Sequence, residues 1–195
     1  MKSILLSTRP KWCEKICHEI GTDKNGKPIY EKPIEVRKTK PSIPTPFKVY
    51  IYCCKAKSQW RYSDYEGAYQ NSKGEIVYAQ LHVIGEFICD KVTPLVPLGL
   101  RGFEVLDETL KAMCLTTNDL NVYGGLKTLY AWHISDLKIY DTPKKLSEFR
   151  VPCRTSCENC KNPLYYNGRC EEDNVKILTR PPESWCYVQE LEERK

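Results

Sequence analysis

The sequence predicts an α+β fold: a small, mostly antiparallel β-barrel decorated by short helices, with a cysteine-rich segment behind it. Three observations support this class. Short stretches with strand-like alternation recur along the chain, only one extended helical stripe is present, and cysteines gather near the end. Because 195 residues suit a domain with a small appendage, we expect a domain over residues 1–150 and a tail over residues 151–195.

The first two predicted elements are a strand over residues 2–7 and an amphipathic helix. The segment 7–10 offers a hydroxyl cap and a proline for the first turn, and Gly21 is the expected stop. The apolar stripe of this helix has i, i+4 spacing and comprises Trp12, Ile16 and Ile20. We expect the helix to pack on a sheet.

The segment 30–41 carries a lysine, a carboxylate and an arginine on a predicted strand. In a regular strand Glu35 and Arg37 point to one face. Pro33 cannot donate to a ladder, so this should be an edge strand or an irregular one, and a bulge at Pro33 would bring Lys32 beside the other two. Two interpretations are open: a surface ion pair worth at most about 1 kcal/mol, or a functional site. The position after the helix favours the site.

The later elements alternate between strands and short helices. In a long strand over residues 75–90, Gly85 marks a place where another backbone or a ligand comes close. The aromatic loop 59–69 contains Trp60 and Tyr62, which either stack on bases or cover one end of the core. The other predicted elements are a strand over 47–55, helices over 105–114 and 116–125, a strand over 129–139, a helical turn or two over 142–149 and a returning strand over 184–188.

Charge is distributed unevenly along the chain. Residues 1–61 contain 14 Lys and Arg against 5 Asp and Glu, a balance of +9, whereas residues 62–195 have a balance of −4. A basic first third indicates an anionic partner, with nucleic acid or nucleotide the commonest candidate, although a solvated lysine-rich surface has the same composition. The apolar run at residues 4–6 is too short for a signal peptide or a membrane span, so we expect a cytoplasmic protein without membrane association.

The eleven cysteines fall into two classes. Six are scattered among apolar residues, where a thiol behaves as a small hydrophobe. Four have zinc-like spacing in the polar tail: Cys153, Cys157, Cys160 and Cys170. In a reducing compartment this pattern predicts a structural Zn²⁺ with no open position, with free thiols or a redox cluster as the alternatives. Cys186 is an alternative fourth ligand, but its place in a predicted strand favours a buried core residue.

In this order the residues resemble the ASCH family, the activating-signal-cointegrator homology domains of the PUA-like superfamily. The resemblance covers about residues 1–150. It rests on a strand and an amphipathic helix followed by a Lys-x-x-Glu-x-Arg element, on Gly85-Glu86 within a strand, and on a late strand with Trp132-His133-Ile134-Ser135-Asp136-Leu137. The Lys-x-x-Glu-x-Arg element consists of Lys32, Glu35 and Arg37.

The resemblance implies a PUA-like pseudo-barrel with a cleft over the Lys-Glu-Arg strand and the first helix, suited to RNA or a modified nucleobase. The acetylated-cytidine amidohydrolases of the family use a lysine, a threonine and a glutamate. Lys32 matches the lysine, but Glu35 stands at the threonine nucleophile and Met113 at the glutamate. These departures favour binding over that reaction.

We therefore expect a module that binds RNA or a modified nucleotide in a basic cleft formed by Lys32, Glu35 and Arg37, with Trp60 and Tyr62 nearby. Whether it is also an enzyme is open. One alternative is a small hydrolase or nuclease with Lys32 and Glu35 as acid and base. The other is a scaffold for protein interactions, in which the aromatic loop and the cysteine tail contact a protein partner.

Overall fold

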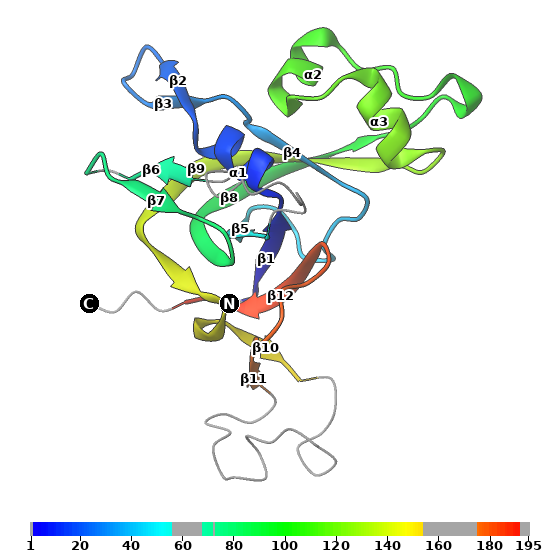
Figure 1. Ribbon diagram of the computed structural model, residues 1–195. Coiled ribbons are helices and arrows are strands. Elements are labelled where there is room, and N and C mark those ends of the chain that lie inside the picture. Colours follow the sequence, from blue (N-terminus) through cyan, green and yellow to red (C-terminus); the bar gives the residue numbers. More distant parts are fainter. Residues whose placement is uncertain (1, 56–67, 72, 154–174, 192–195) are drawn as a thin grey trace.

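Figure 1 shows the computed structural model of the chain, of which residues 2–55, 68–71, 73–153 and 175–191 are described. The fold is α+β and mostly sheet, with three α-helices in these ranges. The strands are β1 (Lys2–Thr8), β2 (Glu19–Thr22), β3 (Pro28–Tyr30), β4 (Ile34–Arg37), β5 (Phe47–Cys53), β6 (Ala68–Gln70), β7 (Ile76–Tyr78), β8 (His82–Leu95), β9 (Leu129–Lys145), β10 (Arg150–Pro152), β11 (Val175–Ile177) and β12 (Trp185–Gln189). The helices are α1 (Pro10–Cys17), α2 (Asp107–Met113) and α3 (Thr117–Gly124).

Six strands form the main sheet, in the order β12-β1-β5-β8-β9-β4. Every neighbouring pair is antiparallel except β1 and β5, which run parallel. The two longest strands, β8 and β9, arch through the centre of the molecule (Figure 1). The predicted edge position of the Lys-Glu-Arg strand is confirmed, because β4 pairs only with β9 among the strands described.

The predicted barrel does not close through strand pairing within the described residues, where β12 and β4 form opposite edges of the sheet. Side chains bridge the gap instead. Trp185 Nε1 donates to Thr39 Oγ1 at 2.9 Å, and the backbone N–H of Ser42 donates to the Tyr187 hydroxyl at 2.8 Å. The chain after β4 is rich in proline, which lacks an N–H, so it is poorly suited to continue a ladder towards β12.

Two apolar layers enclose the edge strand. Ile34 and Val36 pack into a cluster with residues of α2, α3 and β9, and that cluster includes Met113 and Leu120. Another cluster lies between α1 and the sheet and includes Trp132, which is opposite Glu35 in the β4–β9 register. The alternation of β4 therefore directs its apolar side chains towards the helical layer and its charged ones to the other face.

The first helix is shorter than predicted. It ends at Cys17, and the residue expected to complete its stripe, Ile20, lies in β2 with 58% of its surface exposed. The predicted hydroxyl cap is also wrong: Arg9 is the N-cap and no side chain caps the helix. The hydroxyl of Thr8 instead accepts a hydrogen bond from Arg37. The hydroxyl that the local sequence suggested as a helix cap thus takes part in a long-range contact with Arg37.

Two further predictions change in detail. The strand predicted over residues 75–90 is two strands, β7 and β8, separated near Leu81, which has φ of 66°. The helical segment predicted over residues 142–149 is confirmed only in its second half: β9 runs to Lys145, and Leu146–Glu148 form one 3₁₀ turn. The close approach at Gly85 is confirmed, because a Cβ there would lie 2.5 Å from the carbonyl oxygen of Lys138.

The described parts of the tail are joined to the rest of the protein. β10 pairs with β11, and β12 pairs with β1 along the edge of the main sheet. The returning strand predicted over residues 184–188 is confirmed by β12. Among the described residues no helix has both the length and the apolar character needed to cross a membrane.

Candidate functional site

A pocket of about 720 Å³ lies beside β4 and the start of α1. Five segments contribute to its wall: the end of β1 with α1, β4 with Lys32, the residues after β5, α3 with Leu115 before it, and the residues before β12. Its lining consists of Ser7, Arg9, Pro10, Lys11, Trp12, Lys32, Glu35, Val36, Arg37, Cys54, Lys55, Leu115, Asp119, Tyr123, Glu183 and Ser184. The structure therefore brings the three charged residues of the predicted Lys-Glu-Arg element to one concave site.

Lys32, Glu35 and Arg37, here called the buried triad, are only 2%, 5% and 8% exposed. Lys32 lies in the irregular stretch before β4, where Pro33 interrupts the strand as predicted. Its Nζ donates to the backbone oxygens of Ile34 at 2.8 Å and Met113 at 2.6 Å, and lies 3.3 Å from Glu35 Oε2. The two carbonyls take two of the three N–H groups of the ammonium, and its charge is paired with the Glu35 carboxylate.

Glu35 joins Lys32 to Arg37. Its Oε1 lies 2.9 Å from Nη2 of Arg37, and the same nitrogen donates to the hydroxyl of Thr8 at 3.1 Å. Thr8 is 1% exposed and ends β1, so the guanidinium also connects the first strand to the edge strand across the open side of the sheet. Such a network holds the planar guanidinium in one orientation.

Two polar atoms of the buried triad have no hydrogen-bond partner within the described structure: Oε2 of Glu35 and Nε of Arg37. The Lys32 ammonium lies 3.3 Å from Oε2 and is its ion-pair partner, without forming a hydrogen bond to it. Buried groups of this kind are normally paired, and an unpaired one costs about 1–3 kcal/mol. The buried triad thus contains one acceptor atom and one donor atom that have no hydrogen-bond partner in the described structure and are buried from solvent.

The pocket has a net positive lining, with five cationic and three anionic side chains. The buried triad supplies two of the cations and one of the anions. The other charged groups are exposed and stand at the rim: Arg9, Lys11, Lys55, Asp119 and Glu183. This balance favours an anionic ligand. Its charge is best accommodated beside the exposed cations Arg9, Lys11 and Lys55.

Two aromatic rings line the wall. Trp12 has the ammonium groups of Lys11 and Lys32 over its ring, at 4.8 and 5.0 Å from the centroid. Tyr123 is 38% exposed, and Lys38 lies 4.8 Å from its centroid. Burial raises the pKa of the Tyr123 hydroxyl, so it stays protonated at neutral pH. Cation–π contacts of this kind place positive charge beside flat apolar surface.

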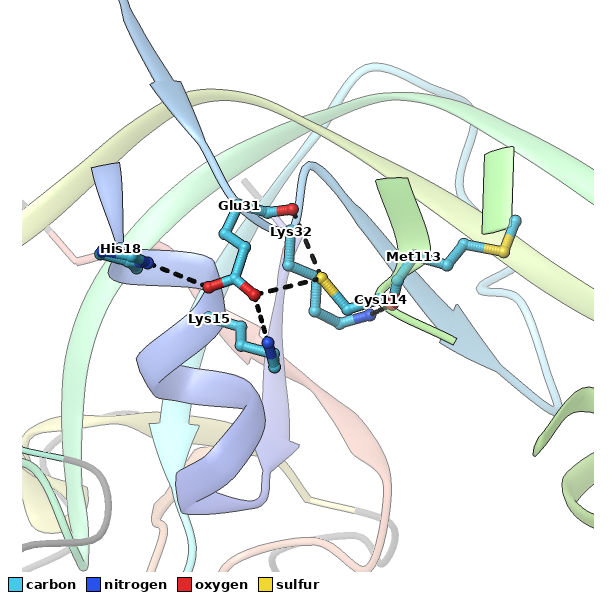
Figure 2. A network of polar contacts seen from close by, with 6 residues as sticks. All are labelled: Lys15, His18, Glu31, Lys32, Met113 and Cys114. Carbon is cyan, nitrogen blue, oxygen red and sulfur yellow. Dashed lines mark hydrogen bonds and ion pairs between the residues drawn. The ribbon is translucent and has the colours of Figure 1, made fainter. Parts of the chain in front are cut away.

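A polar network adjoins the pocket (Figure 2). The carboxylate of Glu31 bonds Lys15 of α1 through Oε1 and lies 2.9 Å from His18 Nδ1 through Oε2. Both contacts lower the pKa of the Glu31 carboxyl, and the hydrogen bond with Lys15 has a larger effect than the one with His18. The thiol of Cys114 donates to the backbone oxygen of Glu31 at 3.4 Å, and burial raises the pKa of this thiol. Figure 2 shows the network beside the Lys32 contact with Met113, so it holds the segment that presents Lys32.

Sequence reasoning missed several groups that hold the buried triad. Thr8 was assigned to the helix cap, and the backbone carbonyl of Met113 has no sequence signal because any residue supplies one. Lys15 lies in the predicted helix and Glu31 in the charged segment 30–41, but no sequence pattern predicts their contact. The register that brings them together depends on long-range packing.

Other predicted site residues lie outside the described residues. These are Trp60 and Tyr62 of the aromatic loop and Cys157, Cys160 and Cys170 of the zinc pattern. Cys153 follows β10 and is half-buried, while Cys186 lies in β12 opposite Leu5 and packs against an apolar cluster. Burial raises the pKa of Cys186 to about 11, but the residue is half-buried and not the fully buried core residue that was predicted. Within the part of the chain that is described, no group of three or more His, Cys, Asp or Glu side chains is arranged to hold a metal.

Comparison with known proteins gives a fold-level likeness only. No protein-family model and no curated protein sequence matches the chain. The crystal structure of ASCH from Zymomonas mobilis is similar over 96% of this chain and 87% of that one, with a TM-score of 0.49 and 13% identity. Its Y47F mutant is similar over 97% and 91%, with a TM-score of 0.48 and 14% identity. Likeness at these scores carries no inference about the family or the function of this chain.

Proposed function

We propose that this chain is an ASCH-type, PUA-like module that binds RNA or a modified nucleotide in the pocket over the buried triad. The observation that carries the proposal is the pocket itself, which has a volume of about 720 Å³ and a net positive lining that includes two aromatic rings and the buried triad. Its volume falls within the range usual for small-ligand sites, about 300–1,000 Å³. A ligand with an anionic group and an aromatic ring matches the positive charge and the aromatic lining of this pocket.

The geometry favours binding over hydrolysis. Acid–base catalysis by the Lys-Glu pair needs a lysine proton and a carboxylate directed at the substrate. Here two backbone carbonyls accept hydrogen bonds from Lys32, and the Glu35 carboxylate is ion-paired with both Lys32 and Arg37. Groups fixed in this way orient a ligand.

Salt-dependent RNA binding tests the proposal. Exposed Arg9 and Lys55 line the rim, so the double variant Arg9→Ala/Lys55→Ala removes positive charge without touching the buried triad. Arg101 and Lys127 are exposed and absent from the lining, so Arg101→Ala/Lys127→Ala is the matched control with the same change in net charge. Fluorescence anisotropy with short single-stranded RNA is measured from about 50 to about 200 mM salt, the range in which phosphate contacts are lost.

We expect the rim variant to bind about tenfold or more weakly and to reduce the salt slope by about 1–2, while the control variant changes little. Equal weakening by both variants would assign the effect to overall charge and contradict a ligand in the pocket. Absence of any RNA or nucleotide binding by the unaltered protein at low salt would remove the proposed function altogether.

A further inference from the structure

Two lysine–tyrosine pairs adjoin the pocket through Arg37, which belongs to its lining. Lys38 directly follows Arg37, and its Nζ lies 4.8 Å from the ring centroid of Tyr123, another lining residue. Tyr130 is opposite Arg37 in the β4–β9 register, and Nζ of Lys40 lies 5.8 Å from its ring centroid. Lys38, Lys40 and Tyr130 do not line the pocket themselves. The two pairs therefore extend the basic and aromatic surface of the pocket beyond its edge.

Both lysines of these pairs are available to an anion. The side chains of Lys38 and Lys40 are exposed, and within the described ranges neither forms an ion pair with a carboxylate. Lys15, Lys27 and Lys48, by contrast, are each paired with a carboxylate. A cation–π contact at an exposed site contributes about 0.5–1 kcal/mol. It holds the ammonium near a flat ring without neutralising its charge, so the two rings set the positions of two unpaired cations.

This arrangement fits a nucleic-acid strand better than a free nucleotide. The phosphate of a single nucleotide in the pocket is accommodated by the rim cations Arg9, Lys11 and Lys55. Such a ligand leaves Lys38 and Lys40 unused, because both lie outside the lining. A strand that leaves the pocket carries further phosphates past them. Surfaces that bind single strands combine cations along the backbone with aromatic rings beside the bases, which is the combination present here.

We infer that the pocket takes one nucleotide of a single-stranded RNA and that the phosphates of the adjoining nucleotides bind Lys38 and Lys40. The surface formed by the Lys38–Tyr123 and Lys40–Tyr130 pairs is here called the lysine–tyrosine track. This inference rests on the proposed function and adds the substrate class to it: an RNA strand several nucleotides long is bound in preference to a free nucleotide. It also gives the direction in which the strand leaves the pocket, past Arg37 towards the start of β9.

Calorimetric titration with RNA of increasing length tests the substrate class. The probes are UMP and AMP and the corresponding dinucleotides and tetranucleotides. We expect the tetranucleotides to bind about tenfold or more tightly than the mononucleotides, and their salt slope to be larger by about 1.4, since each phosphate contact of a single strand contributes about 0.7. A mononucleotide that binds as tightly as its tetranucleotide would overturn the inference while leaving nucleotide binding in the pocket intact.

A pair of variants tests the track itself. Lys38→Ala/Lys40→Ala should lower the ratio of tetranucleotide to mononucleotide affinity by about fivefold or more and remove the extra salt slope. Lys24→Ala/Lys144→Ala is the matched control with the same change in net charge. Neither of its lysines lines the pocket, and Lys144 also lies over a tyrosine ring, 5.2 Å from the centroid of Tyr140. The control should keep the ratio of the unaltered protein.

The remaining outcomes separate this inference from the proposed function. An unchanged ratio in Lys38→Ala/Lys40→Ala, or an equal fall in the control variant, would show that the track does not bind the strand. Polyglutamate that competes with the tetranucleotide as well as RNA of equal charge does would assign the track to acidic peptides and overturn the inference. If neither nucleotides nor RNA bind to the unaltered protein, the proposed function fails first.

Discussion

Replacing Lys32 with methionine removes a charge from the interior and keeps most of the apolar stem. Lys32 is 2% exposed and its ammonium supplies the donors for two backbone carbonyls as well as one side of the Glu35 carboxylate. Methionine offers none of these hydrogens. The Lys32→Met variant therefore leaves two buried carbonyl oxygens without this donor and leaves Glu35 with Arg37 alone.

The expected loss of stability follows from these contacts. Removing one partner of a buried ion pair costs about 3–5 kcal/mol, and each carbonyl left without a donor costs about 1–3 kcal/mol. These contributions overlap because the atoms belong to one network. Arg37 also continues to compensate Glu35, so we expect a decrease of about 3–5 kcal/mol in the free energy of unfolding. For a domain of this size the melting temperature falls by roughly 6–20 °C.

Urea unfolding followed by circular dichroism measures the difference, with the melting temperature as a second observable. Lys27→Met is the matched control: Lys27 is also ion-paired, to Asp136, but the two side chains are 61% and 69% exposed. We expect no measurable change for it. A loss below about 1 kcal/mol in Lys32→Met, the range of surface pairs, would falsify the assignment of Lys32 to a buried network.

Four further outcomes are expected. Because the Lys15 and His18 contacts lower the pKa of Glu31, their stabilisation is present above the carboxyl's unfolded value of about 4.3 and is lost as pH falls through the lower folded value. Glu31→Gln should remove that acid-side slope in pH-dependent melting, and Glu14→Gln on exposed α1 surface should keep it. Gly85→Ala should give little folded protein by gel filtration, since the added Cβ meets a backbone oxygen at 2.5 Å; a melting temperature like that of the original chain would contradict this packing. Thr116→Ala should cost about 1 kcal/mol in urea unfolding through loss of the α3 capping box, and an unchanged midpoint would argue against the cap. Metal analysis under reducing conditions should give about one equivalent of zinc, lost in Cys160→Ser, and less than about half an equivalent in the unaltered protein would remove the zinc prediction.

The strand positions and the meeting of the buried triad were predictable because local rules determine them. Alternation set the two faces of β4, and a proline before it explained both its edge position and the turn of Lys32 towards Glu35. The burial of the triad was not predictable. A charged run on an edge strand is usually solvated, and only the packing of α1, α2 and the β1 end around it excludes water.

The errors have a common physical origin. Helix α1 stops early because β2, which contains Ile20, pairs with β3 in a two-stranded sheet, and this pairing competes with helix continuation. The sheet is open between β4 and β12 among the described strands. This opening was not predictable, because local alternation determines only which face a side chain occupies, whereas the pairing of distant strands depends on the whole sheet. Nothing in the spacing of the sequence sets how far two edge strands remain from each other.

The pairing of β1 with β12 also sets an order of events during synthesis. Leu5 lies opposite Cys186, so one edge of β1 has no strand beside it until some 180 further residues have been made. At about 5–20 residues per second this takes roughly 10–40 s. During that interval an apolar strand with unpaired N–H and C=O groups is open to other chains, the situation that favours aggregation. Nascent chains stopped before β12 should therefore depend on chaperones more than the completed chain does.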